Sequence, residues 1–255
     1  MITFWRLVQM ESVIILKNVK DTLVNNAIFC GFIAVVSGYV LKAFGTSDSF
    51  ASLQAASLIV SSIGFEVYRG LFRLLSDIEG DKHIQYYFTL PIPNMFIFLK
   101  MVCSFVLNGI IFATSSLIVL RIVLPSHIIL SNINYFMFFL TVIVIGGFFG
   151  VFTFFLTAYT KNMMKISNTL MRILFPIWIM GGFQFSYAVA KSISPILGYM
   201  TLLSPYTYAN EAMRSVILGS TGFMNIWTAL SVLVVTSIII WFIAMRKLRK
   251  RLDFL

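Results

Sequence analysis

Acidic side chains gather at one place in the sequence, where Asp77, Glu79 and Asp81 alternate along five positions. Such carboxylates can bind calcium, but the spacing and distal Glu of an EF-hand loop are missing here. The two histidines, His83 and His127, have no partner at metal-ligand spacing. The sequence also lacks the phosphate-binding loop GxxxxGK[ST] and the motifs GxSxG and HExxH. We therefore expect neither a catalytic site nor a nucleotide or metal cofactor in this chain.

Three further charges, Glu66, Arg69 and Arg73, follow the uncharged run 49–65. Glu66 and Arg69 are three positions apart and can pair on one helix face. Ionisable residues inside a membrane are functional candidates by default. Near the membrane edge, however, snorkelling of the side chain to water is an alternative explanation, and it applies to Lys100 as well. No charge is expected near the middle of any apolar segment, which disfavours an ion-relay transporter.

The composition indicates the environment of these residues. Of the 255 residues, 59% are hydrophobic and only 11% are charged, against about 45–50% and 25% in soluble domains. A soluble enzyme and a nucleic-acid-binding domain are excluded on this ground, although the net charge is +10. The expected fold is an all-α integral membrane protein.

Uncharged runs predict six membrane-spanning helices, because a crossing needs about 20 mostly apolar residues. The predicted helices cover residues 24–44, 50–72, 97–120, 133–159, 170–190 and 223–245. The second is rich in serine, which indicates a helix that faces protein or a cavity. An even number of crossings places both termini on one side, and the positive-inside rule makes that side cytoplasmic. In this orientation all but four of the 19 Lys and Arg residues are cytoplasmic.

Three segments outside the spans also carry a pattern. Residues 1–22 have apolar positions at helical spacing and predict an amphipathic helix in the cytoplasmic interface, or else an extension of the first span. Residues 73–96 form a cytoplasmic loop in which 81–88 can be a short amphipathic helix. Residues 246–255 form a basic tail suited to anionic lipid.

The predicted fourth span carries two packing features. Gly146 and Gly150 form a GxxxG pattern, typical of close helix contact. Aromatic side chains recur on one face at helical spacing and can line a transport path, or can face lipid or a neighbouring helix. These residues are Phe148, Phe152, Phe155 and Tyr159.

Residues 204–214, which read SPYTYANEAMR, and residues 89–93, which read TLPIP, resemble motifs of ABC-2-type exporter permeases. In that family the first motif lies after a Pro- and Gly-containing fifth span, and the second follows the coupling helix. Length, six spans, the N-terminal helix and the basic tail agree with the resemblance over essentially the whole chain. The pattern usual before the coupling helix is weak here.

The resemblance implies the membrane subunit of a bacterial inner-membrane exporter of the drug, polysaccharide and lipid group, with residues 1–255 as one domain. Two permease subunits, identical or different, would form the path, and two P-loop ATPase subunits would bind ATP and Mg²⁺ below them. Spans one, two and five would line the path. Residues 191–219 would form an outer re-entrant segment between helices five and six.

The resemblance also assigns roles to residues. The expected ATPase-coupling residues are Asp77, Glu79, Asp81, Lys82, Tyr86, Tyr87 and Pro91. Glu66, Arg69 and Arg73 would brace the cytoplasmic base of the second helix. The expected outer gate consists of Pro205, Tyr208, Glu211 and Arg214. A surface salt bridge worth about 0–1 kcal/mol is the alternative for the last two.

Two other classes of function stay open at this point. An ATP-independent secondary transporter, channel or assembly factor would have no ATPase partner, and no inverted repeat supports a secondary transporter. A membrane enzyme acting on lipid would need a polar catalytic cluster at one face. The transported cargo is not encoded in any motif of the sequence.

Overall fold

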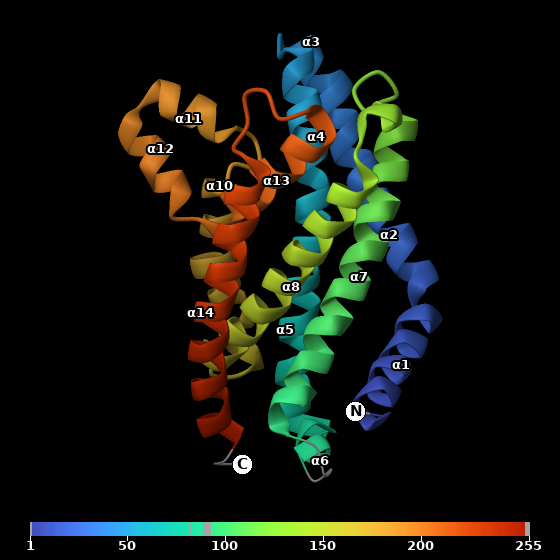
Figure 1. Cartoon of the computed structure of the whole chain (residues 1–255), viewed down its shortest axis with the longest axis vertical. Helices are drawn as coiled ribbons and strands as arrows, with labels where there is room; N and C mark the ends of the chain where they lie inside the picture. The colour runs from blue at the N-terminus through green and yellow to red at the C-terminus, as the bar shows by residue number, and fades with distance from the viewer. Residues whose placement is uncertain (1, 82, 89–92, 253–255) are drawn as a thin grey trace.

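The computed structural model describes residues 2–81, 83–88 and 93–252, and every regular element among them is helical. Lys82 and Pro91, two of the expected coupling residues, lie outside the described residues. The two ends of the described chain lie at the same end of the bundle, next to α6 (Figure 1).

The helices follow the apolar runs of the sequence closely. In chain order they are α1 (Ile2–Lys17), α2 (Val19–Val35), the π-helical turn η1 (Val36–Val40), α3 (Leu41–Ala43), α4 (Asp48–Gly64), α5 (Glu66–Ser76), the π-helical turn η2 (Asp77–Asp81), α6 (His83–Phe88), α7 (Asn94–Val123), η3 (Leu130–Asn132), α8 (Tyr135–Tyr159), η4 (Met163–Lys165), α9 (Ile166–Thr169), the π-helical turn η5 (Leu170–Leu174), α10 (Phe175–Met180), α11 (Tyr187–Ile193), α12 (Pro195–Leu202), α13 (Pro205–Leu218) and α14 (Ile226–Leu252).

Among the described residues, five helical segments are long and apolar enough to cross a membrane. They are Val19–Ala43, Asp48–Gly80, Met95–Val123, Tyr135–Tyr159 and Ile226–Leu248. Each coincides with a predicted span. The predicted helix 170–190 is different, because the helical run from α9 through α10 ends at Met180. Gly182, with φ of +75°, turns the backbone there.

Segments expected to be loops or tails are largely helical. Residues 73–96 contain the end of α5, then η2, α6 and the start of α7, and the short helix predicted at 81–88 is found at His83–Phe88. The basic tail predicted at 246–255 continues α14 as far as Leu252. The segment 191–219 contains the end of α11 and all of α12 and α13.

Helix α8 lies between α7 and α14 and packs against both (Figure 1). At Gly146 an added Cβ would come within 3.1 Å of the Val106 Cα atom. A Cβ added at Gly150 would lie equally close to the Cβ atom of Phe105. The GxxxG pattern therefore marks a close contact between α8 and α7, as the sequence predicted.

The serine-rich segment that contains α4 is the most buried of the five. In its most apolar stretch 78% of the residues are buried, against 28% for the segment that contains α2. The prediction that this helix faces protein is confirmed. Its neighbours are α7, α13, α8 and α2.

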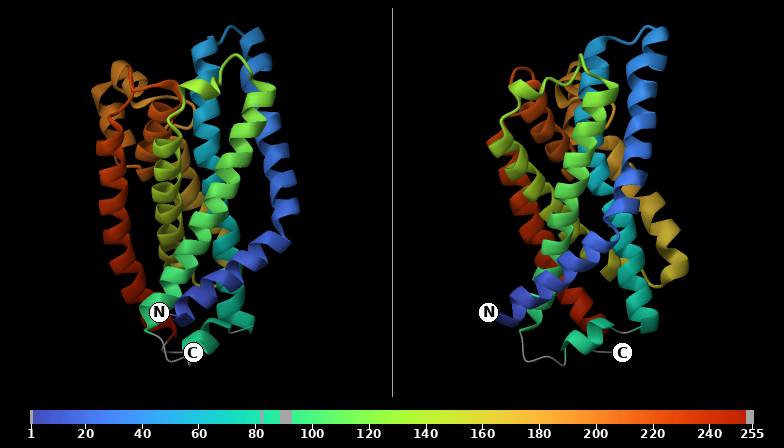
Figure 2. Two further views of the ribbon diagram at one scale, coloured as in Figure 1. Left: turned by 45° about the vertical axis from the view of Figure 1, so that its right-hand side comes forward. Right: turned by 90° about the vertical axis from the view of Figure 1, so that its right-hand side faces the viewer.

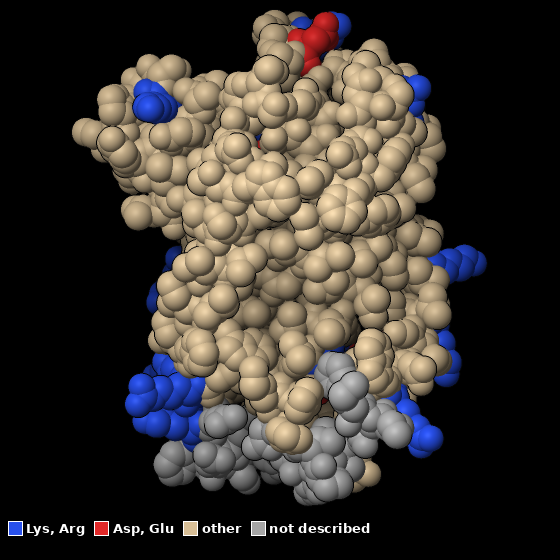
Figure 3. Space-filling model, viewed as in Figure 1, with Lys and Arg blue, Asp and Glu red and all other residues tan. Residues whose placement is uncertain are grey.

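Helix α1 turns away from α2 at Asn18 and lies against α7 (Figure 2). The amphipathic helix predicted at 1–22 thus ends at Lys17, and residues 19–22 belong to α2. Leu7 of α1 is buried, whereas Trp5 is 59% exposed. In Figure 3 basic side chains gather at the α6 end and also appear at the edges at mid-height, and a band without exposed charge separates them from a few charges at the opposite end.

Candidate functional site

A buried ion pair lies at the end of the bundle opposite α6. Glu211 and Arg214 are on successive turns of α13, with their side chains 3.0 Å apart and each only 1% exposed. The Arg214 guanidinium donates to Ser57 Oγ on α4 through Nε at 3.1 Å and Nη2 at 2.6 Å. It also donates to the carbonyl oxygens of Phe185, at 3.1 Å, and Gly182.

The Glu211 carboxylate is equally well satisfied. It accepts hydrogen bonds from the backbone N–H groups of Tyr187, at 3.0 Å, and Met224, at 3.1 Å. We call the seven residues of this cluster the Arg214 network: Ser57, Gly182, Phe185, Tyr187, Glu211, Arg214 and Met224. The alternative of a weak surface salt bridge is wrong, because tertiary packing removes both charges from solvent.

The other two expected gate residues support the start of α13. Pro205 is in its first turn, where the missing N–H costs no helical hydrogen bond. Tyr208 donates to the carbonyl oxygen of Leu202 at 3.0 Å. Sequence reasoning missed Tyr206, which is 2% exposed and packs against Phe149 with ring centroids 4.8 Å apart. The structure therefore joins Glu211 and Arg214 in one network, and the gating role stays a prediction.

The serines of α4 contact four neighbouring helices, α13, α10, α7 and α2. Ser57 accepts from Arg214, and Ser61 accepts from the indole N–H of Trp178 on α10 at 3.0 Å. Ser62 accepts from Ser116 of α7 at 3.0 Å and lies 3.1 Å from the Cys30 sulfur of α2. The serines noted in the sequence are thus interhelical contacts.

Glu66, Arg69 and Arg73 follow one another along α5, from its first turn to its last. They border a cavity of about 210 Å³ with Asn108 and residues of the α1–α2 bend. Glu66 is 7% exposed and accepts from the Asn108 amide at 3.1 Å, and its other oxygen is 3.8 Å from Arg69. Snorkelling explains Arg69, whose side chain is 44% exposed, but not Glu66.

The expected coupling residues lie at the α6 end. Asp77 accepts from the backbone N–H of Ile84 at 2.8 Å and so fixes the start of α6. Glu79 accepts from the N–H of Met163 at 3.1 Å, which joins η2 to the segment leading into α9. Asp81 ends η2, and Tyr86 is 64% exposed.

Sequence reasoning did not assign a role to Lys100 or Glu11, which meet 89 positions apart. Lys100, on α7, is 1% exposed, and its ammonium is 2.8 Å from the Glu11 carboxylate of α1. The same ammonium lies 4.1 Å from the ring centroid of Tyr87 on α6. Ser104 donates to Glu11 at 3.5 Å. We call Glu11, Tyr87, Lys100 and Ser104 the Lys100 node. Snorkelling to water does not explain Lys100, because its side chain is buried.

The aromatic stripe of α8 forms a continuous stack. Ring centroids are 5.7 Å apart for Phe148 and Phe152, and 6.1 Å apart for Phe152 and Phe155. Phe148 and Phe152 are buried in the main core, as in the alternative of contact with neighbouring helices. Tyr159 is 45% exposed and its ring lies under the Lys247 ammonium at 3.3 Å. Lining of a path by the stripe stays a prediction.

In the described parts of the chain, no three His, Cys, Asp or Glu side chains come together as a metal site. The charged clusters described above consist of ion pairs and hydrogen bonds between helices. Each one is therefore described by the helices that it joins.

The comparison with protein families decides what kind of protein this is. The family model described as ABC-2 type transporter matches residues 3–218, which include α2 to α13 and all but the first residue of α1. The chain belongs to the ABC-2 type transporter family. No curated protein matches the chain.

The sequence resemblance is thereby confirmed, and the protein is a permease component of an ABC transporter. Permeases of this family are membrane subunits that typically have no nucleotide site of their own and associate with an ABC ATPase. The family and the apolar helices together indicate a multi-pass membrane protein.

Proposed function

We propose that this permease forms the translocation path of an ATP-driven exporter and that its ATPase docks at the α6 end. The observation that carries the proposal is the Lys100 node, in which one buried ammonium contacts side chains of both α1 and α6. A surface helix that transmits force needs a direct connection to the bundle, and this node supplies one. Tyr86 of α6 is 64% exposed at this end.

A second connection leads from the α6 end to the opposite end. Glu79 contacts the backbone at Met163, just before α9, and the helical run from α9 continues to α10. The last turns of α10 then contact α13. Ser204 donates to the carbonyl of Ile177 at 2.6 Å, and Asn210 donates to that of Gly181 at 2.8 Å.

This route joins the proposed ATPase dock to the Arg214 network through contiguous contacts. A displacement of η2 would be passed along α9 and α10 to Gly181 and Gly182, whose carbonyls bind Asn210 and Arg214. We infer that α10 opens and closes the far end, which would be the outer gate. The physical basis for this inference is the unbroken series of contacts from η2 to α13.

The assembly that fits this mechanism has two permease subunits, identical or different, and two ATPase subunits that bind ATP and Mg²⁺. The α6 end would be cytoplasmic, with both termini there, in the inner membrane of a bacterium. The basic residues of α14 lie at this end, as the positive-inside rule requires. A sixth crossing by α9 to α10 with a re-entrant α12 and α13 belongs to the same proposal.

The test is purification of the tagged chain from its native membrane in mild detergent, with partners identified by mass spectrometry. We expect a stoichiometric P-loop ATPase, and ATP hydrolysis by the purified complex. Tyr86→Ala should reduce recovery of the ATPase, whereas the control Tyr199→Ala, on exposed α12, should not. A preparation without ATPase, repeated after chemical crosslinking, would favour an ATP-independent transporter instead.

A further inference from the structure

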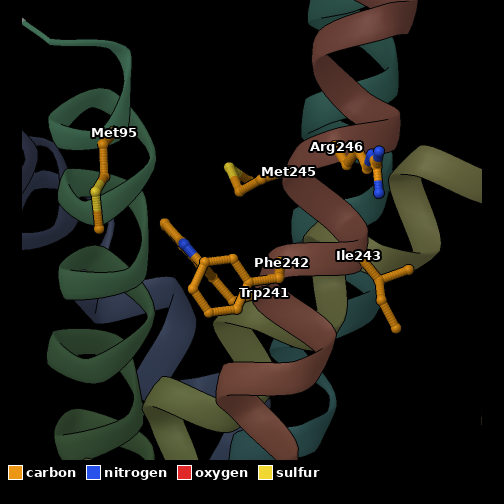
Figure 4. Close-up of a pocket in the computed structure, with 6 residues that line it drawn as sticks. All are labelled: Met95, Trp241, Phe242, Ile243, Met245 and Arg246. Carbon is orange, nitrogen blue, oxygen red and sulfur yellow. The ribbon is translucent and has the colours of Figure 1, made fainter.

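A groove between α7 and α14 lies at the α6 end of the bundle. It has a volume of about 530 Å³ and is lined by Met95, Trp241, Phe242, Ile243, Met245 and Arg246. Figure 4 shows Met95 on one wall, with Trp241, Phe242 and Met245 projecting from α14 into the space between the helices. All but Arg246 are apolar or aromatic.

The floor of the groove is a small core separate from the main one. Phe98 of α7, Phe154 of α8 and Ala244 of α14 pack together in it, and Met245 belongs to the same cluster. Trp241 is edge-on to Phe154, with centroids 6.2 Å apart, so its indole is held in place. The wall residues Met95 and Phe242 are 56% and 68% exposed. The groove is therefore a formed apolar surface that faces outward from the bundle.

Positive charge lies directly beside this surface. Residues 246–251 read RKLRKR, and no Asp or Glu occurs between Glu211 and Asp253. Arg246 is one helical turn beyond Phe242, and Lys247 and Lys250 are exposed on the following turn. The Lys247 ammonium is fixed over the Tyr159 ring at the end of α8. An anion beside the groove would meet several cations that no nearby acid on α14 neutralises.

We propose that the groove between α7 and α14 is a binding site for one anionic phospholipid. Its acyl chain would lie along Trp241 and Phe242, and its phosphate would be bound by Arg246 and the neighbouring lysines. Each Lys or Arg near a membrane surface contributes about 1 kcal/mol of attraction to anionic lipid. The long apolar stems of these side chains let them reach headgroup depth. A second copy of this chain could cover the apolar groove with an apolar face of its own. It would then make no use of the positive charges beside the groove, and for this reason we favour an anionic lipid.

The test uses Trp241 as the reporter in a variant whose other three tryptophans are phenylalanine, checked for wild-type thermal stability. The variant is placed in nanodiscs that contain a small, equal mole fraction of brominated phosphatidylglycerol or brominated phosphatidylcholine. Bromine quenches indole fluorescence only at contact range. We expect the anionic lipid to quench Trp241 at least about twofold more than the neutral lipid.

The charge dependence makes the test specific. Arg246→Gln combined with Lys250→Gln should equalise quenching by the two lipids, because the apolar groove remains while the headgroup contacts are lost. The matched control, Lys42→Gln with Lys191→Gln, changes exposed cations at the opposite end and should alter nothing. Equal quenching in the parent variant, a preference that survives loss of Arg246 and Lys250, or no quenching by either lipid would each overturn the proposal. None of these readouts requires an ATPase, so the site is tested independently of the proposed function.

Discussion

The two ends of the permease use buried charge in different ways. In the Arg214 network both charged side chains are 1% exposed, and they make hydrogen bonds with α4, two loops and α11. In the Lys100 node the lysine is buried, but Glu11 is 14% exposed and has a long hydrogen bond from Ser104. The first cluster is saturated, whereas the second has fewer contacts and an edge open to solvent.

This difference suggests that the two ends of the bundle behave differently during transport. A fully satisfied buried network fixes one arrangement of the segments it joins, because any alternative leaves a charge unpaired. A node with fewer contacts can be rearranged at lower cost. We therefore expect the α6 end to move when an ATPase acts on it, and the far end to open only as a unit with α10 and α13.

The largest expected effect is at Arg214. Arg214→Met leaves the Glu211 carboxylate buried without its partner, which typically costs about 3–5 kcal/mol. The melting temperature in detergent, followed by size-exclusion chromatography after heating, should fall sharply, with a low yield of folded protein. A variant as stable as the parent would show that Glu211 finds another partner and that the network is not rigid.

A smaller effect is expected at Lys100. Lys100→Met removes the hydrogen-bonded ion pair and the contact with Tyr87, for which the expected loss is about 1.5–3 kcal/mol, because Glu11 can still reach water. Hydrogen exchange in the isolated chain should increase in both α1 and α6 and stay unchanged in α13. The exposed Lys17→Met in α1 is the control. Faster exchange in α1 alone would show that Lys100 does not stabilise α6.

Exchanging the charges of Lys100 and Glu11 tests separately how the node holds α1 and α6. Lys100→Glu combined with Glu11→Lys restores an ion pair between α1 and α7 but places a carboxylate near the Tyr87 ring. We expect the protection of α1 to return while α6 stays loosened, because the face of an aromatic ring attracts cations. Recovery of both helices together would mean that Tyr87 contributes nothing through its ring.

The smallest effect is expected at the exposed pair of Lys42 and Asp48. Their side chains are 2.7 Å apart but 58% and 63% exposed. Lys42→Met should leave the free energy of unfolding nearly unchanged, and any small loss should shrink as salt is added. Thermal denaturation at two salt concentrations measures this. A loss as large as that for Arg214→Met would refute the view that burial, and not distance, separates the three pairs.

Much of the fold could be predicted from the sequence because local patterns determine it. Five spans, the short helix before α7 and the contact at Gly146 all follow from apolar runs and residue spacing. The helix predicted at 170–190 failed at Gly181 and Gly182, since an apolar run does not reveal where a backbone turns within it.

The charged clusters were harder to predict because they depend on tertiary packing. The sequence singled out Glu211 and Arg214 as a pair but gave no sign that Ser57, more than 150 positions away, would bury them. Glu11 and Lys100 are likewise distant in the sequence. A buried lysine needs a partner, and only the arrangement of α1 against α7 shows which acid that is.

The most direct test of the account is site-specific crosslinking in the native membrane. A photoreactive amino acid replaces Tyr86 on α6 or, as the control, Leu203, which is 84% exposed between α12 and α13. We predict a crosslink from position 86 to a P-loop ATPase and none from position 203. No ATPase crosslink at position 86, or equal crosslinks from both positions, would contradict docking of an ATPase at the α6 end.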